Sequence, residues 1–179
     1  MSVINDLINI ESDSLDFGNY ELATKTKKDG IEYKGDIYKI KTFNEITKLE
    51  KNGMFVYESV PGTAVHGFRS SEEDVSFIVE GTETSSITLE LEPETDYKIH
   101  IDDIYVGKNK TNLGGKLSIS VDLEPGREVK VDVRKAFDEE FIWQKKNRSF
   151  FAGNVDLSQQ NGWDSVRVAD PGIRSVKKK

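Results

Sequence analysis

The sequence predicts a mainly β protein built as an antiparallel β-sandwich. Apolar and polar residues alternate with a period of two through residues 87–134, as expected when each strand has one buried and one solvated face. Turn signals separate these runs at short intervals, which is typical of sandwiches and barrels. No helical pattern of 10–15 residues lies between the runs, so a parallel α/β sheet is not expected.

Residues 1–18 predict an N-terminal arm or short helix. Four apolar residues fall at helical spacing there, namely Val3, Ile4, Leu7 and Ile8. A helix of this length does not hold alone in water, so the segment is expected to pack against the body.

Residues 19–82 predict an N-terminal β subdomain. Tight turns are expected at Asp29-Gly30 and Asn52-Gly53, because both pairs tolerate positive φ. Residues 44–50 fit a single helical turn, and Pro61-Gly62 ends a strand. The extended runs are 20–26, 31–34, 37–43, 54–60 and 75–79.

Residues 83–136 predict a sandwich-type module of Ig-like character, either within one domain or as the second of two small β subdomains. The inward-facing set is Ile87, Leu89, Leu91, Tyr97, Ile99, Ile101, Leu117, Ile119, Val121, Leu123, Val129, Val131 and Val133. His100 alternates with this set and is expected on the solvated face.

Residues 137–179 predict an aromatic, basic docking segment. From Phe141 onward there are eight Lys or Arg and three Asp or Glu, a net charge of +5, which leaves −12 for residues 1–140. Exposed aromatic residues near Arg and Lys are typical of interface anchors. The candidate anchors are Phe141, Trp143, Phe150, Phe151 and Trp163. The alternative is a terminal helix in which Phe137, Phe141 and Trp143 cap the sandwich.

A second candidate contact region is the cationic stretch 108–116, expected to be a loop between strands. Lys108, Asn109 and Lys110 would contact a ligand there, since binding residues concentrate on loops held by a rigid scaffold. The alternative is a plain hairpin connection whose glycines supply positive φ.

No catalytic or metal signature is present, and no cofactor is expected. The chain has no cysteine and two histidines, and His66 is expected to be structural. No nucleophile elbow, P-loop or dinucleotide fingerprint occurs. The 32 carboxylates leave a small hydrolase with an unrecognised acid pair as an open alternative.

Composition limits the partners and the compartment. An acidic chain of net charge −7 disfavours nucleic acid. No apolar run approaches the length of a membrane span, so no membrane partner is expected. No signal peptide is visible at the N-terminus, which predicts a cytoplasmic protein, or an extracellular one if the chain is a mature fragment.

Two stretches, residues 49–68 and 87–123, resemble small β-rich proteins of anaerobic Firmicutes that carry an endosialidase-like label. The second stretch is also similar to Ig-like accessory modules found beside polysaccharide-active enzymes. The resemblance covers residues 33–134 and implies a β module. It does not carry sialidase activity over, because the chain has no Ser-x-Asp-x-Gly-x-Thr-Trp box. Only Arg69, Arg127 and Arg134 precede the C-terminal segment as arginines that could bind a sialate.

The sequence therefore predicts a non-enzymatic binding or assembly module that docks to itself or to a protein partner through its C-terminal segment. The alternative is a carbohydrate-binding accessory module, because tyrosine rings stack on sugar faces. Its candidate platforms are Tyr33, Tyr38, Tyr57, Tyr97 and Tyr105.

Overall fold

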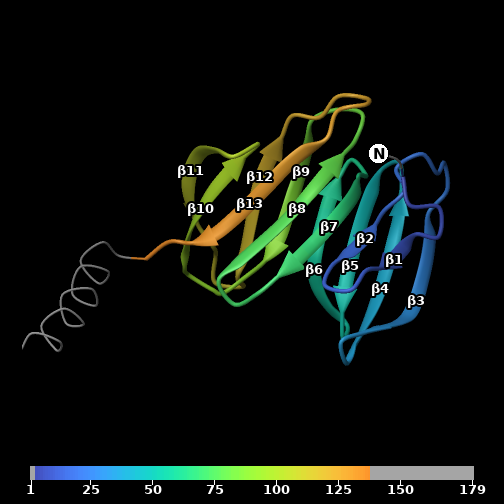
Figure 1. The fold of residues 1–179 in the computed structure, drawn as a ribbon, viewed down its shortest axis with the longest axis horizontal. Coiled ribbons are helices and arrows are strands. Elements are labelled where there is room, and N and C mark those ends of the chain that lie inside the picture. Colours follow the sequence, from blue (N-terminus) through green and yellow to red (C-terminus); the bar gives the residue numbers. More distant parts are fainter. Residues whose placement is uncertain (1–2, 138–179) are drawn as a thin grey trace, which may run out of the picture. The chain divides into compact units, whose positions relative to one another are not determined.

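The computed structural model describes residues 3–137, which form 13 strands in two antiparallel sheets and contain no helix (Figure 1). The chain divides into two units, Met1–Ala136 and Phe137–Lys179. The first unit is the body described below. The prediction of a mainly β, sandwich-type fold is confirmed; an Ig-like topology stays a prediction.

Sheet A has seven strands. In spatial order they are β1 (Ile8–Ile10), β2 (Leu15–Phe17), β7 (Ala64–Ser70), β8 (Asp74–Glu80), β13 (Val129–Lys135), β10 (Asp96–Ile101) and β11 (Ile104–Lys110).

Sheet B has six strands. In spatial order they are β12 (Lys116–Val121), β9 (Ser85–Glu90), β6 (Met54–Val60), β5 (Ile46–Lys51), β4 (Asp36–Phe43) and β3 (Thr26–Tyr33).

The two inner faces bury one continuous apolar core. Alternation predicted much of it, since Ile87, Leu89, Val131 and Val133 are fully buried. An aromatic cluster lies at its centre. The Phe17 and Tyr57 rings are 5.2 Å apart and nearly perpendicular, and Phe77 contacts Tyr57 at 5.6 Å in the same geometry. Edge-to-face pairs of this kind add to the energy of burial.

A group of buried hydroxyls lies beside this cluster. Thr63 Oγ1 is 2.8 Å from both the Tyr57 hydroxyl and Ser59 Oγ. Thr47 Oγ1 donates to the Thr63 carbonyl at 2.8 Å and accepts the Thr63 N–H at 3.1 Å. Thr42 Oγ1 completes the group at 2.8 Å from Thr47 Oγ1. Each of these buried polar atoms has a hydrogen-bond partner, which offsets the cost of removing it from water.

Residues 19–82 and 83–136 do not form separate subdomains. Strand β6 pairs with β9 in sheet B, and β8 pairs with β13 in sheet A. Each sheet therefore takes strands from both sides of the expected boundary. Both segments are joined because they are buried in one core. The local periodicity of the sequence does not reveal this.

The N-terminal segment does not form the predicted helix over its described residues. Leu7 adopts a φ of 72°, outside the right-handed helical region, and β1 begins at Ile8. The Ile4 N–H donates to the Gly18 carbonyl at 3.0 Å, and the Gly18 N–H donates to the Leu7 carbonyl at 3.0 Å. Ile4, Leu7 and Ile8 are buried through this turn instead of along a helical stripe.

Two further local predictions are wrong. Asp29-Gly30 lies inside β3, where the register with β4 shifts between Lys28 and Ile31. The positive φ of Gly30 serves a β-bulge there and not a hairpin turn. Residues 46–51 form β5 in place of a helical turn. The Asn52-Gly53 turn is confirmed between β5 and β6.

No helix in the described part of the chain is long and apolar enough to span a bilayer.

Candidate ligand-binding cleft

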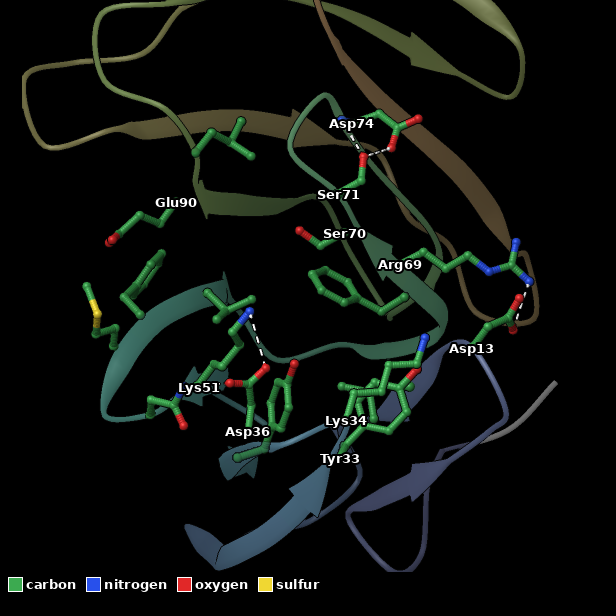
Figure 2. A pocket seen from close by; sticks show the side chains of 18 residues that line it. Asp13, Tyr33, Lys34, Asp36, Lys51, Arg69, Ser70, Ser71, Asp74 and Glu90 are labelled. Atoms are coloured by element: carbon green, nitrogen blue, oxygen red, sulfur yellow. Dashed lines mark hydrogen bonds and ion pairs between the residues drawn. The ribbon is translucent and has the colours of Figure 1, made fainter.

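A cleft of about 670 Å³ is lined by residues of both sheets (Figure 2). Sheet B contributes the β3–β4 hairpin, the β5–β6 hairpin and the end of β9. Sheet A contributes the β7–β8 hairpin, while Asp13 and Leu15 come from the β1–β2 connection and the start of β2. Tight turns position these side chains, with Asn52 at a φ of 52° and Gly53 at 80°.

The apolar part of the cleft is built on core side chains. Leu15, Tyr38 and Phe68 are buried and belong to the hydrophobic core. Tyr33, at the end of β3, is half-buried and its ring centroid is 6.0 Å from that of Tyr38, with the planes tilted by 60°. Phe55 of β6 is also half-buried. Rigid aromatic surface is therefore available to a ligand in the cleft.

On the sheet B side, the polar groups are held by the β5–β6 turn. Asn52 Nδ2 donates to Asp36 Oδ1 at 2.8 Å, and Asn52 Oδ1 accepts the Ile37 N–H at 2.9 Å. Lys51 Nζ lies 3.7 Å from Asp36 Oδ2. Figure 2 shows Asp36 and Lys51 beside one another on this side. Amide, carboxylate and ammonium groups thus converge from two hairpins.

On the sheet A side, the β7–β8 hairpin supplies hydroxyl, carboxylate and guanidinium groups. Ser71 Oγ donates to Asp74 Oδ1 at 2.7 Å and accepts the Asp74 N–H at 3.2 Å. Arg69 Nη2 lies 3.5 Å from Asp13 Oδ1, and more than half of each side chain is exposed. Surface pairs of this kind are weak, so both groups can turn to a ligand.

Two lysines lie over aromatic rings of the cleft. Lys34 Nζ is 5.3 Å from the Tyr33 ring centroid, and Lys116 Nζ is 4.4 Å from that of Phe55. Lys116 also contacts Glu90 Oε1 at 3.2 Å. The Lys34 contact is exposed and held by cation–π attraction alone among the described interactions, so Lys34 can swing aside from Tyr33.

Burial raises the pKa of Tyr38, and Asp36 and Tyr33 raise it further through their charges. Tyr38 therefore stays neutral in the cleft and offers its ring and hydroxyl. The four cleft carboxylates, Asp13, Asp36, Asp74 and Glu90, each have a cationic or hydroxyl partner. These carboxylates offer hydrogen-bond acceptors to a ligand in the cleft.

The predicted tyrosine platforms fall into three classes. Tyr57 and Tyr97 are fully buried, and burial raises the pKa of Tyr57. Tyr33 and Tyr38 line the cleft. Tyr105 is 54% exposed on β11, outside the cleft lining.

Only part of the cationic stretch is the loop that the sequence predicts. Residues 111–115 connect β11 and β12, and Gly115 there has a positive φ of 81°. Lys108, Asn109 and Lys110 are instead the last three residues of β11, paired with β10, and all three are exposed. The other predicted anchors, Phe141, Trp143, Phe150, Phe151 and Trp163, lie outside the described residues.

The two histidines lie on strands of sheet A. His100 is half-buried and its ring centroid is 5.6 Å from that of Tyr105. His66 Nδ1 lies 3.9 Å from Asp16 Oδ2. Neither residue lines the cleft.

Sequence reasoning missed Asn52 and Phe55 as site residues, and it considered Arg69 only in rejecting sialidase activity. The turn signal at Asn52-Gly53 placed a hairpin correctly but said nothing about which other hairpins share its end of the sandwich. Aromatic residues flanking turns, such as Tyr33 before Lys34-Gly35, were the one available signal.

Comparisons with protein-family models, curated proteins and solved structures found no match to this chain.

Proposed function

We propose that this chain is a non-enzymatic β-sandwich binding module whose cleft receives a carbohydrate. The observation that carries the proposal is the combination, in one cleft, of aromatic rings with amide, carboxylate and guanidinium groups from both sheets. Ligand sites are typically concave, largely apolar and equipped with a few fixed polar groups.

The aromatic rings suit the apolar faces of a sugar. Tyr33 is half-buried, so one part of its ring is fixed by packing near Tyr38 while the rest is accessible. A sugar that stacks on Tyr33 would replace the Lys34 ammonium, which is exposed and mobile enough to leave at small cost.

The polar groups suit sugar hydroxyls. Asp36 and Asn52 already hold one another through a 2.8 Å hydrogen bond, so their orientation is set before a ligand arrives. Arg69 and Asp13 offer a planar donor and a planar acceptor on the sheet A side. Such preorganised groups lower the entropic cost of binding.

A hydrolase is a weaker proposal. Each cleft carboxylate already contacts a cation or a hydroxyl. A retaining or inverting glycosidase needs one carboxyl that is free to act as a proton donor.

Calorimetric titration of the full chain with a panel of neutral and acidic oligosaccharides tests the proposal. Tyr33→Ala is expected to weaken binding of any hit by up to about tenfold, because one lost stacking contact is worth about 0.5–1.5 kcal/mol. Arg69→Gln is expected to weaken it by a similar factor without changing the melting temperature, because Arg69 is exposed.

Tyr105→Ala is the matched control, since Tyr105 is exposed but lies outside the cleft lining. It should leave the affinity unchanged. If no oligosaccharide in the panel binds, or if Tyr105→Ala lowers the affinity as much as Tyr33→Ala, the cleft is not the carbohydrate site.

Protein–protein assembly is the second candidate function. The edge strand β11 exposes Ile104, Tyr105 and Val106 in succession, at 66%, 54% and 57% of their surface. An exposed apolar edge strand is a site at which another chain can pair. Docking through residues 137–179 stays a prediction.

A further inference from the structure

The outer face of sheet B carries a row of directly opposed lysines. Lys27 on β3 is the register partner of Lys41 on β4, and Lys41 is the partner of Lys48 on β5. Their neighbours Tyr38, Ile40 and Leu49 alternate with them and are buried in the core. All three ammonium groups therefore project from the same, outer face.

This arrangement costs stability. Directly opposed residues of an antiparallel pair have Cβ atoms about 5 Å apart, and like charges there repel. Burial lowers the pKa of Lys41, and Lys25, Lys48 and Lys27 lower it further. Packing does not explain the choice of lysine at three successive positions, because threonine or glutamate would suit a solvated strand face equally well.

Carboxylates neutralise little of this charge. Glu50 lies 3.5 Å from Lys48, and Glu58 is the register partner of Lys48 on its other side. Among the described residues, neither Lys27, Lys39 nor Lys41 takes part in an ion pair. The lysines thus form a local concentration of positive charge on the outer face of sheet B, in a chain whose net charge is −7.

A small hollow lies among these side chains. It has a volume of about 40 Å³ and is lined by Lys27, Lys39, Lys41, Lys48 and Glu50, a net charge of +3. A hollow of this size holds a compact group and excludes a sugar ring. Lysine ammonium groups bind phosphate-like oxyanions as point charges with several donors each.

We propose that this lysine row binds a single doubly charged oxyanion, held by Lys27, Lys41 and Lys48. The anion is either free inorganic phosphate or sulfate, or a phosphate ester on a larger ligand. A nucleic acid is disfavoured, because residues 1–140 carry a net charge of −12 and would repel an extended polyanion beyond the row.

The test is an NMR titration of the full chain, with backbone amides and lysine side-chain resonances observed at constant ionic strength. The probes are inorganic phosphate, inorganic sulfate, glucose 6-phosphate, neutral glucose and a short single-stranded DNA. Dianions are expected to shift resonances of residues 27, 41 and 48 in a saturable manner, whereas chloride at equal ionic strength is not. Comparison of inorganic phosphate with glucose 6-phosphate shows whether the free anion or the ester binds more tightly.

Lys41→Gln should weaken the dianion by about tenfold, since a charge-assisted hydrogen bond is worth about 1.5–3 kcal/mol and 1.4 kcal/mol is tenfold. Lys28→Gln is the matched control, because Lys28 is exposed on the same strand but alternates away from the row. Lys41→Gln removes repulsion, so it should fold at least as well as the unaltered chain.

The proposal is overturned if no dianion binds better than chloride, or if Lys28→Gln weakens binding as much as Lys41→Gln. It is also overturned if the DNA binds more tightly than every phosphate or sulfate probe through the same residues, which would indicate a nucleic-acid surface. Tyr33→Ala should not affect any of these titrations, so a failure here is distinct from a failure of the carbohydrate cleft.

Discussion

At the scale of single residues, the cluster of buried hydroxyls depends on Thr63. Its Oγ1 contacts the Tyr57 hydroxyl and Ser59 Oγ, and its backbone contacts Thr47. Thr63→Val keeps the shape of the side chain but leaves two buried hydroxyls without this partner. We expect a loss of about 2 kcal/mol in the free energy of unfolding, measured by urea denaturation.

Thr88→Val is the control for that change. Thr88 Oγ1 also shares a 2.8 Å hydrogen bond, with Ser118 Oγ, but on the outer face of sheet B where water can replace it. Its effect should stay within about 0.5 kcal/mol. Equal losses in the two variants would show that burial of the hydroxyl group does not determine its contribution.

At the scale of elements, two glycines allow the cost of a positive φ to be distinguished from the cost of a steric clash. Gly115 and Gly126 adopt nearly the same φ, +81° and +82°. A Cβ at Gly115 would overlap the Leu91 carbonyl oxygen, whereas none of the surrounding atoms lies within 4 Å of a Cβ at Gly126. Gly126→Ala should cost about 1 kcal/mol, the strain of a left-handed conformation.

Gly115→Ala should lower the free energy of unfolding by about 1–3 kcal/mol more than Gly126→Ala. The segment just before β12 and the segment just after β9 must move apart to relieve the contact. Thermal unfolding of both variants checks the difference. A smaller loss for Gly115→Ala than for Gly126→Ala would contradict the close approach of the two segments. The sequence Asn-Leu-Gly-Gly predicted a turn there, but only the structure distinguishes Gly115 from Gly114.

The predictability of each strand follows from what it buries. β9, β10, β12 and β13 bury aliphatic or aromatic residues on one face only, so their alternation is visible in the sequence. β5 buries Thr47 and Leu49. Because the threonine is polar and is satisfied only by distant hydroxyls, the alternation of β5 was hidden and a helical turn was predicted.

β7 was missed for a related reason. Its register with β8 shifts between His66 and Arg69, so its buried residues do not keep a period of two. The cleft was missed because its residues come from separate hairpins. Turn signals locate hairpins along the chain, but which hairpins share one end of the sandwich depends on sheet order, and local sequence does not encode that order.

At the scale of the whole molecule, charge is distributed unevenly. The lysine row concentrates positive charge on one face of sheet B, while the body as a whole is acidic. A second row of opposed cations, Lys98, Lys108 and Arg134, crosses the outer face of sheet A. On β11, Lys108 and Lys110 follow the exposed apolar residues, and edge lysines oppose uncontrolled strand pairing. β11 therefore combines an exposed apolar surface with two lysines that restrict which chains can pair with it.

The boundary after Ala136 allows the predicted docking role of the C-terminal segment to be tested apart from the body. Residues 3–136 contain both sheets and the core, and β13 ends at Lys135. A chain ending at Phe137 is expected to keep the β circular-dichroism spectrum of the full chain and to melt within a few degrees of it. Light scattering should show a larger assembly for the full chain and a monomer for the shortened one, because the shortened chain lacks the aromatic and basic residues predicted to anchor a partner. Equal masses would contradict self-association through residues 137–179. If both chains then form the same assembly, β11 is the candidate interface. Val106→Lys should dissociate that assembly, because it places a charge on the exposed edge strand.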